Sequence, residues 1–336
     1  MTVDPQNEWT ASKADRLNRV VALALAAFLI FTGAAAVPGQ DVIRVETELA
    51  AFEVAVTDSN GKPISGLDAA DFKIFENGEE KDIAFFQPLI DGEYRRPMLV
   101  VFALDVSGSL TPAELEKLRS AMDQFIDRLA HPNAYFAVTT FAMNVKRRQS
   151  FTNRTDRVRR ALENIERDRD GLSTHAYDAV DDSVRLIARN APKAIRGERP
   201  KRAVVVITDG FPVGDVVAPS TVIERANDAG VSVYSIILPS FSRLSAGDRP
   251  LLTPFEATGL VRRTGGVSLY ASEGSLDGIF RAMAEQIAAS YAIAYYPEDK
   301  AEAGNEFREV RIEAGKGLRI KQNRPGFRLG ENGRPR

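Results

Sequence analysis

The chain has 336 residues, of which 44 % are hydrophobic and 27 % are charged, a balance typical of a globular protein. Its formal net charge of -2 provides no overall attraction to nucleic acid or to an anionic membrane. Cysteine is absent, which excludes disulfides, thiolate metal sites, cysteine nucleophiles and a lipid-modified cysteine.

Residues 1–36 are typical of a secretory signal peptide. Three basic residues precede the apolar run 20–31, and the small residues 33–36 supply an Ala-x-Ala cleavage site. An uncleaved membrane anchor is the alternative, because residues 20–37 are almost all apolar and approach the length that spans a bilayer. In either case we expect an exported protein, periplasmic or secreted, with no membrane span in the mature chain unless the leader stays uncleaved.

Residues 41–92 predict a β region built from hairpins. Apolar residues alternate with polar or small ones over 52–56, and again over 72–85 on both sides of an Asn-Gly turn. About fifty residues of hairpin make a marginal domain, so these strands need a partner surface. Short strands expected over 292–329 offer one. We therefore expect the two flanks to form one small β domain that the central region interrupts.

The central region, residues 97–291, alternates strands with helices. Its strands at 98–104 and 202–208 are continuous apolar runs, as in strands buried on both faces of a sheet. The same patterns predict further strands at 135–141, 146–151, 231–238 and 266–270, and helices at 111–129, 156–166, 174–191, 221–229, 255–264 and 276–289. Strands joined by helices of this length predict an α/β fold, with a doubly wound, mainly parallel sheet flanked by helices.

Polar residues follow the two most apolar strands. Asp105 ends the first, Ser107 and Ser109 come in the turn after it, and Asp209 follows the second. Ligands gather outside the carboxyl ends of parallel strands, and neighbouring central strands would bring the two carboxylates together. Nearby carboxylates repel each other unless a cation lies between them, and neither turn contains a lysine or arginine. A divalent cation that prefers oxygen ligands, such as Mg2+, resolves this conflict.

Three short motifs resemble the metal-ion-dependent adhesion site of the von Willebrand factor type A domain. They are Asp-Val-Ser-Gly-Ser at 105–109, Thr174 in the context Thr-x-x-Tyr-Asp-Ala, and Thr-Asp-Gly at 208–210. Their order and spacing agree with that domain, and the resemblance covers residues 97–291.

The flanks resemble a narrower group. Residues 71–78 and 291–297 are similar to segments of exported bacterial proteins called von Willebrand factor A related, which are frequent in Acidobacteria. This resemblance refines the architecture more than the function.

The resemblance to the adhesion site implies a bound Mg2+, with Mn2+ or Ca2+ as alternatives. It implies hydroxyl ligation by Ser107, Ser109 and Thr174, while Asp105 and Asp209 would act directly or through water. Neutral hydroxyl ligands leave the cation much of its charge. An Asp or Glu carboxylate from a partner protein would then replace a water and complete the metal shell.

Residues beside these motifs allow more than one interpretation. Ser173 could replace Thr174 as the ligand, and His175 is either a solvated loop residue or a pH-sensitive ligand contact. Asp178 is expected to support the site through hydrogen bonds, and Asp182 to be a solvated helix charge.

The sequence favours an adhesion-type module that captures an unidentified protein partner through that partner's acidic group. A structural scaffold with an unoccupied metal site and a metal-assisted hydrolase are the alternatives. The chain lacks Gly-x-Ser-x-Gly, His-Glu-x-x-His and Gly-x-x-x-x-Gly-Lys motifs, so we expect it not to be an enzyme. We expect no nucleic-acid partner.

Overall fold

The structure is a computed structural model that describes residues 49–59, 62–87, 96–107, 112–166, 168, 173–238, 252–270, 276–288, 290–297, 306–315 and 317–328. These residues belong to a single unit, Thr47–Arg336. The predicted signal peptide at 1–36 and the predicted ligand Ser109 lie outside the described residues. Within the described ranges, no helix has both the length and the apolar character that crossing a bilayer requires.

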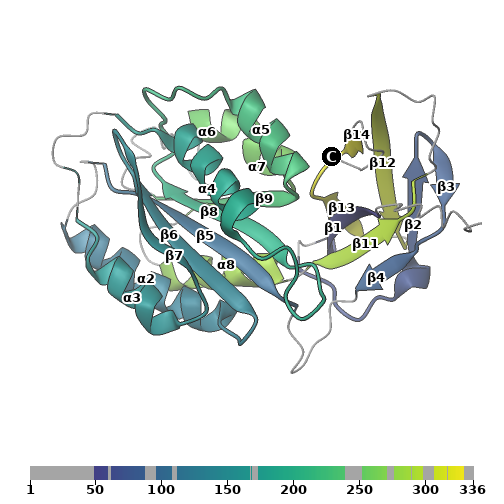
Figure 1. The fold of residues 1–336 in the computed structure, drawn as a ribbon, viewed down its shortest axis with the longest axis horizontal. Helices are drawn as coiled ribbons and strands as arrows, with labels where there is room; N and C mark the ends of the chain where they lie inside the picture. The colour runs from purple at the N-terminus through teal and green to yellow at the C-terminus, as the bar shows by residue number, and fades with distance from the viewer. Residues whose placement is uncertain are drawn as a thin grey trace, which may run out of the picture. The chain divides into compact units, whose positions relative to one another are not determined.

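A six-stranded sheet with the order β10-β9-β8-β5-β6-β7 forms the centre of the α/β region (Figure 1). Its strands are β5 (Met98–Asp105), β6 (Ala134–Phe141), β7 (Val145–Thr152), β8 (Lys201–Thr208), β9 (Val231–Ile237) and β10 (Ser268–Tyr270). Neighbouring strands are parallel except β7, which runs antiparallel to β6. Every residue of β5 is buried, as its unbroken apolar sequence predicts for a central strand.

Helices cover both faces of this sheet. The first face packs against α2 (Pro112–Leu129), α3 (Thr155–Glu163) and α8 (Leu276–Ala288). The second packs against α4 (Ala176–Asn190), α5 (Pro219–Asp228), α6 (Pro254–Ala257) and α7 (Leu260–Arg263). On the first face, Phe125 of α2 contacts Phe102 of β5 and Phe280 of α8, with ring centroids 5.4 and 5.2 Å apart. The α/β class with a doubly wound, mainly parallel sheet is therefore confirmed.

One predicted helix is wrong. The sequence predicts a single helix over 255–264, whereas the structure has the two short helices α6 and α7. Gly259 lies between them with φ +72°, in the left-handed region that ends an α-helix. The apolar residues on either side still face the same core, so the periodicity gave no sign of the break.

The two flanks together build two antiparallel four-stranded sheets, β13-β1-β11-β4 and β14-β12-β2-β3. The strands before the central region are β1 (Ala50–Thr57), β2 (Phe72–Glu76), β3 (Glu79–Lys81) and β4 (Phe85–Gln87), with a short 3-10 helix at Ala69–Asp71. Those after it are β11 (Tyr291–Tyr295), β12 (Phe307–Ala314), β13 (Arg319–Gln322) and β14 (Gly326–Arg328). β1 pairs with β11 and β13, and β2 pairs with β12.

These two sheets share one hydrophobic core to which both flanks contribute. Phe52 and Phe72 from the first flank pack with Tyr291, Tyr295 and Phe327 from the second. The ring centroids of Phe72 and Tyr291 are 5.2 Å apart, and those of Phe52 and Tyr295 are 6.4 Å apart. Neither flank could bury these rings alone, which explains why the segments pair across the intervening α/β region.

The predicted second hairpin is only partly correct. β2 and β3 pair across Asn77 and Gly78, whose φ values of +50° and +90° suit a tight hairpin turn. Phe85 does not continue this hairpin, because it belongs to β4 and pairs with β11 in the other sheet. Alternation identifies the side of a strand that faces a core, but it does not identify the strand's partner.

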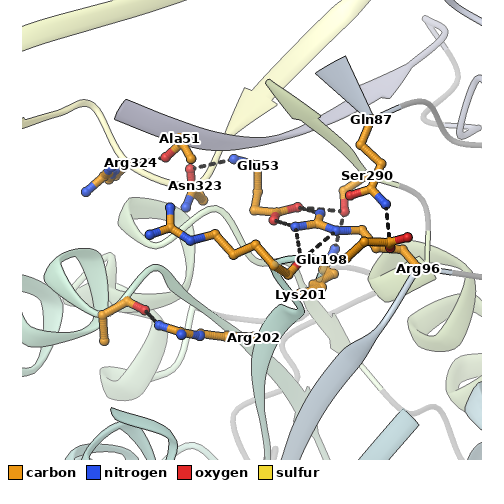
Figure 2. A network of polar contacts seen from close by, with 12 residues as sticks. Ala51, Glu53, Gln87, Arg96, Glu198, Lys201, Arg202, Ser290, Asn323 and Arg324 are labelled. Carbon is orange, nitrogen blue, oxygen red and sulfur yellow. Dashed lines mark hydrogen bonds and ion pairs between the residues drawn. The ribbon is translucent and has the colours of Figure 1, made fainter. Parts of the chain in front are cut away.

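A polar network joins the β region to the α/β region (Figure 2). Two nitrogens of Arg96 contact the two carboxylate oxygens of Glu53, each at 2.6 Å. Lys201 donates to Ser290 Oγ at 2.7 Å, and Ser290 donates to Glu53 Oε2 at 3.1 Å. Burial lowers the pKa of Lys201 to about 8, although the Glu53 charge opposes this. Burial also opposes ionisation of Glu53, yet the Arg96 charge and hydrogen bond hold the pKa of Glu53 below its ordinary value.

Candidate metal centre

The carboxyl ends of β5 and β8 lie side by side because these strands are parallel neighbours, with Leu104 paired to Ile207. Asp105 is the last residue of β5, and Asp209 follows β8 directly. The Asp105 side chain is buried, whereas Asp209 is half-buried at the sheet edge. The strand pairing thus brings the two predicted carboxylates to one place.

Neutral donors hold both carboxylates. The Thr208 hydroxyl donates to Asp105 Oδ2 at 2.8 Å and lies 3.5 Å from Asp209 Oδ1. The backbone N–H of Ser107 donates to Asp105 Oδ1 at 2.9 Å, and that of Phe211 donates to Asp209 Oδ1 at 2.9 Å. The Thr208 hydroxyl therefore orients Asp105, a role that the sequence motif did not reveal.

The electrostatics of this pair favour a cation. Burial raises the pKa of Asp105, against hydrogen bonds from Ser107 and Thr208. Burial also raises the pKa of Asp209 to about 6, where the Asp105 charge adds to the increase and the Phe211 N–H opposes it. The main influences on either carboxyl include no lysine or arginine. Two acids that are costly to ionise together would be stabilised in their charged form by a metal ion.

The structure places Thr174 at the same edge of the sheet. Thr174 and Val213 form an antiparallel bridge with N–H···O distances of 3.0 and 2.9 Å, and Val213 lies four residues beyond Asp209. The next residue, His175, donates its N–H to Ala142, directly after β6. Both Thr174 and Ser107 are buried here. The sheet therefore brings Asp105, Ser107, Thr174 and Asp209 to one edge, while their metal ligation stays a prediction.

Asp178 supports this edge by fixing the loop after Asp209. Its carboxylate accepts the N–H groups of Val216 at 3.1 Å and Val217 at 2.8 Å. His175 Nδ1 lies 2.9 Å from Asp178 Oδ2, and its side chain is 18 % exposed. The interpretation of His175 as a solvated loop residue is therefore wrong, because the imidazole is bound to the acid that fixes this loop. Asp182 is exposed, as expected.

Gly210 allows the turn at Asp209 to pack closely. Its φ is +82°, and a Cβ at this position would lie 2.6 Å from Thr253 Oγ1. The N–H of Phe255 donates to the Gly210 carbonyl at 3.1 Å, and Thr253 caps the start of α6. The start of α6 therefore holds the backbone that carries Asp209.

The donor set suits a hard divalent cation. Among the described residues, no group of three or more histidine, cysteine, aspartate or glutamate side chains could hold a metal. A metal at Asp105 and Asp209 would therefore need hydroxyl oxygens as well, which Ser107 and Thr174 offer. An all-oxygen set of this kind suits Mg2+, Mn2+ or Ca2+ better than zinc or copper.

Comparison with known proteins identifies the α/β region. Residues 100–244 match the family model for the von Willebrand factor type A domain. The chain contains a von Willebrand factor type A domain. The narrower resemblance of the flanks to exported bacterial proteins stays a prediction. No curated protein sequence matched the chain.

Several solved structures are similar to this von Willebrand factor type A domain and its surroundings. An aerotolerance-related membrane protein from Bacteroides fragilis has 18 % identity and a TM-score of 0.44, over 56 % of this chain and 98 % of its own. BatB from Bacteroides thetaiotaomicron has 18 % identity and a TM-score of 0.41, over 56 % and 97 %. The vWF domain of the type V pili tip protein Mfa5 from Porphyromonas gingivalis has 11 % identity and a TM-score of 0.43, over 58 % and 96 %.

Proposed function

We propose that this protein is an exported adhesion-type module that binds a partner protein through a divalent cation, with Mg2+ as the preferred ion. The von Willebrand factor type A domain is typically a protein-interaction module. The observation that carries the proposal is the Asp105–Asp209 pair at the carboxyl ends of two neighbouring central strands, where neutral donors orient each carboxylate.

Both kinds of oxygen ligand have a place in this proposal. Ser107 and Thr174, together with Ser109 outside the described residues, would supply neutral hydroxyl oxygens. Asp105 and Asp209 would contribute directly or through water. When bound, the cation would supply a Lewis-acidic centre that an incoming carboxylate can ligate. Thr208 and the Ser107 N–H keep Asp105 oriented before any ion arrives.

The charge of the site explains why the metal would control partner binding. Without a cation, the ionised Asp105 and Asp209 would repel an acidic group of the partner. With a divalent cation and neutral hydroxyl ligands, the same edge of the sheet would attract that group. Capture of the partner should therefore depend on the metal, and the partner's contact residue should be Asp or Glu.

We also infer that the site binds rather than catalyses. The histidine beside Thr174 has its Nδ1 bonded to Asp178, which itself accepts two loop N–H groups. That arrangement suits a residue that holds a loop in place. A general base would need to face the ion and an incoming substrate.

Partner capture from an envelope extract tests the proposal. The full mature chain would be immobilised as wild type, as Asp105→Ala and as Glu285→Ala, an exposed control on α8. We expect wild type and Glu285→Ala to retain the same protein in Mg2+, to release it in chelator and to recover it when Mg2+ is restored. Asp105→Ala should retain none of it while keeping the wild-type circular dichroism spectrum. Equal retention by Asp105→Ala, or in chelator, would contradict the proposal.

A further inference from the structure

A cavity of about 410 Å³ lies where the β region meets the α/β region. Residues of β1 and β11 line one side, and the start of β8 and the turn between α5 and β9 line the other. The cavity is at the amino-terminal end of β8, whereas Asp209 follows the carboxyl end of that strand. An eight-residue strand spans about 26 Å, so the cavity is separate from the candidate metal centre.

Three arginines around this cavity form no ion pair with any described residue: Arg199, Arg202 and Arg324. A fourth arginine, Arg96, forms an ion pair with Glu53. Arg324 is buried, and its guanidinium lies over the Phe52 ring, 4.9 Å from the centroid. Arginine at such a site offers several donors in a fixed plane, which suits a carboxylate or a phosphate.

The hydrogen bonds of Arg202 and Arg324 leave donors unused. Arg324 Nη2 donates to the Ala51 carbonyl at 3.0 Å, and Arg202 Nη1 donates to the Ala229 carbonyl at 2.8 Å. The Nε of each is buried without a hydrogen-bond partner among the described residues. A buried donor of a charged group that lacks an acceptor is costly, and native structures seldom leave one unmatched.

The positive charges also disfavour one another. Burial lowers the pKa of both Arg202 and Arg324, and the charge of Arg199 lowers it further. The pKa of Arg324 falls to about 10. Besides Glu53, two further acids line the cavity. Glu198 accepts a hydrogen bond from Gln87 at 3.0 Å, and Asp228 partly offsets the charge at Arg324. With Arg96 paired to Glu53, three arginines face these two acids, and one more anionic group would balance the cavity.

Apolar residues form part of the wall as well. Phe85 of β4, which is 43 % exposed, and Ala292 and Ala294 of β11 line the side formed by the β region. The volume lies within the range of small-molecule sites, which combine apolar walls with a few polar groups that fix orientation. A ligand here needs an anionic head and an apolar body.

We propose that this cavity binds a small organic anion whose carboxylate or phosphate group pairs with Arg202 and Arg324 and whose apolar body lies against Phe85 and Ala292. The bound anion offsets the positive charge of guanidinium groups whose donors are only partly satisfied, and it relieves the repulsion from Arg199. Because Arg202 belongs to the α/β region and Arg324 to the β region, the same ligand also strengthens the junction between them.

Calorimetric titration in chelator tests this site without involving the candidate metal centre. The probes are phenyl phosphate, benzoate and the neutral benzyl alcohol, titrated at low ionic strength into wild type, Arg199→Gln, Arg202→Gln and Arg189→Gln. Arg199 is exposed, so its variant is expected to fold even if changes at Arg202 disturb packing. Arg189 is an exposed arginine on α4 outside the cavity and is the control.

We expect at least one anionic probe to bind one-to-one, raising the unfolding temperature of wild type. Affinity should fall at least tenfold in Arg199→Gln and Arg202→Gln and stay unchanged in Arg189→Gln. The tighter of phenyl phosphate and benzoate identifies the preferred head group. Failure of both anions to bind, equal binding to all four proteins, or equal binding of benzyl alcohol would overturn the proposal.

Discussion

Replacing Asp209 with asparagine should stabilise the metal-free protein and abolish its stabilisation by Mg2+. Asparagine keeps an oxygen that can accept the Phe211 N–H but removes the charge that Asp105 repels. The same substitution removes a proposed metal ligand. The variant should therefore be more stable than wild type without the ion and less stable than wild type with it.

The magnitude follows from the raised pKa of Asp209. The pKa rises from 3.8 to about 6, roughly two units, and each unit corresponds to about 1.4 kcal/mol. Because Asp209 is only half-buried, solvent screening reduces the resulting cost to about 1–2 kcal/mol. The folded state binds the proton more tightly than the unfolded state, so its stabilisation is complete below pH 3.8 and is lost as the pH rises through about 6.

Thermal unfolding at pH 7.5 measures both effects. In chelator, we expect Asp209→Asn to unfold roughly 3–6 °C above wild type, given about 2–4 °C per kcal/mol for a chain of this size. With Mg2+ at about a hundred times its Kd, the free energy of unfolding of wild type should rise by about 2.7 kcal/mol, which makes wild type more stable than the variant. Glu285→Gln, at an exposed site on α8, should behave as wild type. A variant that is less stable in chelator, or that gains as much from Mg2+ as wild type, would refute this reasoning.

Three further substitutions test the fold around the two sites by thermal unfolding. Gly210→Ala should cost about 3 kcal/mol, because the φ of +82° is strained for alanine and the new Cβ would clash with Thr253. Lys201→Met should match or exceed wild-type stability at pH 7. As the pH rises from about 8 to 10.5, the stability of wild type should increase relative to that of the variant, because the folded state favours the neutral amine. Glu53→Gln should cost about 3–5 kcal/mol, because Arg96 and Lys201 would lose their buried counter-ion.

Each of these substitutions has an outcome that would contradict its reason. Gly315→Ala, where a Cβ meets nothing within 4 Å, should be almost neutral; a Gly210→Ala protein of similar stability would contradict the close approach to Thr253. Parallel pH profiles for wild type and Lys201→Met would contradict the lowered pKa. A neutral Glu53→Gln would show that the network at the junction contributes little to stability.

Much of the fold could be predicted because the hydrophobic pattern of each central strand reflects how it is buried. β5 and β8 are continuous apolar runs because helices cover both faces of the sheet, and helical periodicity identified α2, α4 and α8. The break at Gly259 and the transfer of Phe85 to another sheet could not be predicted. Both depend on partners that are distant in the chain, which local patterns do not specify.

The sequence was sufficient to predict which strand ends carry the candidate site. Asp105 and Asp209 could be brought together from the sequence because parallel neighbours align their carboxyl ends. The roles of Thr208 and Asp178 were not predictable, since they depend on which donors a folded loop presents. The bond between His175 and Asp178 had a weak signal in their i,i+3 spacing at a helix start.

The arginine cavity had no sequence signal. Arg202 and Arg324 lie more than a hundred residues apart, and each reads as an ordinary surface charge at the end of a strand. Only the pairing of β1 with β11 and β13, and the packing of the β region against the start of β8, makes them neighbours of one cavity.

Calorimetric titration of Mg2+ into the wild-type protein and into Asp105→Ala most directly tests whether oxygen atoms at the ends of β5 and β8 hold a divalent cation. We predict a saturable one-to-one binding heat for wild type and none for Asp105→Ala, with both proteins folded by circular dichroism. Equal heats for the two proteins would contradict the metal centre, and with it the proposed means of capturing an acidic partner.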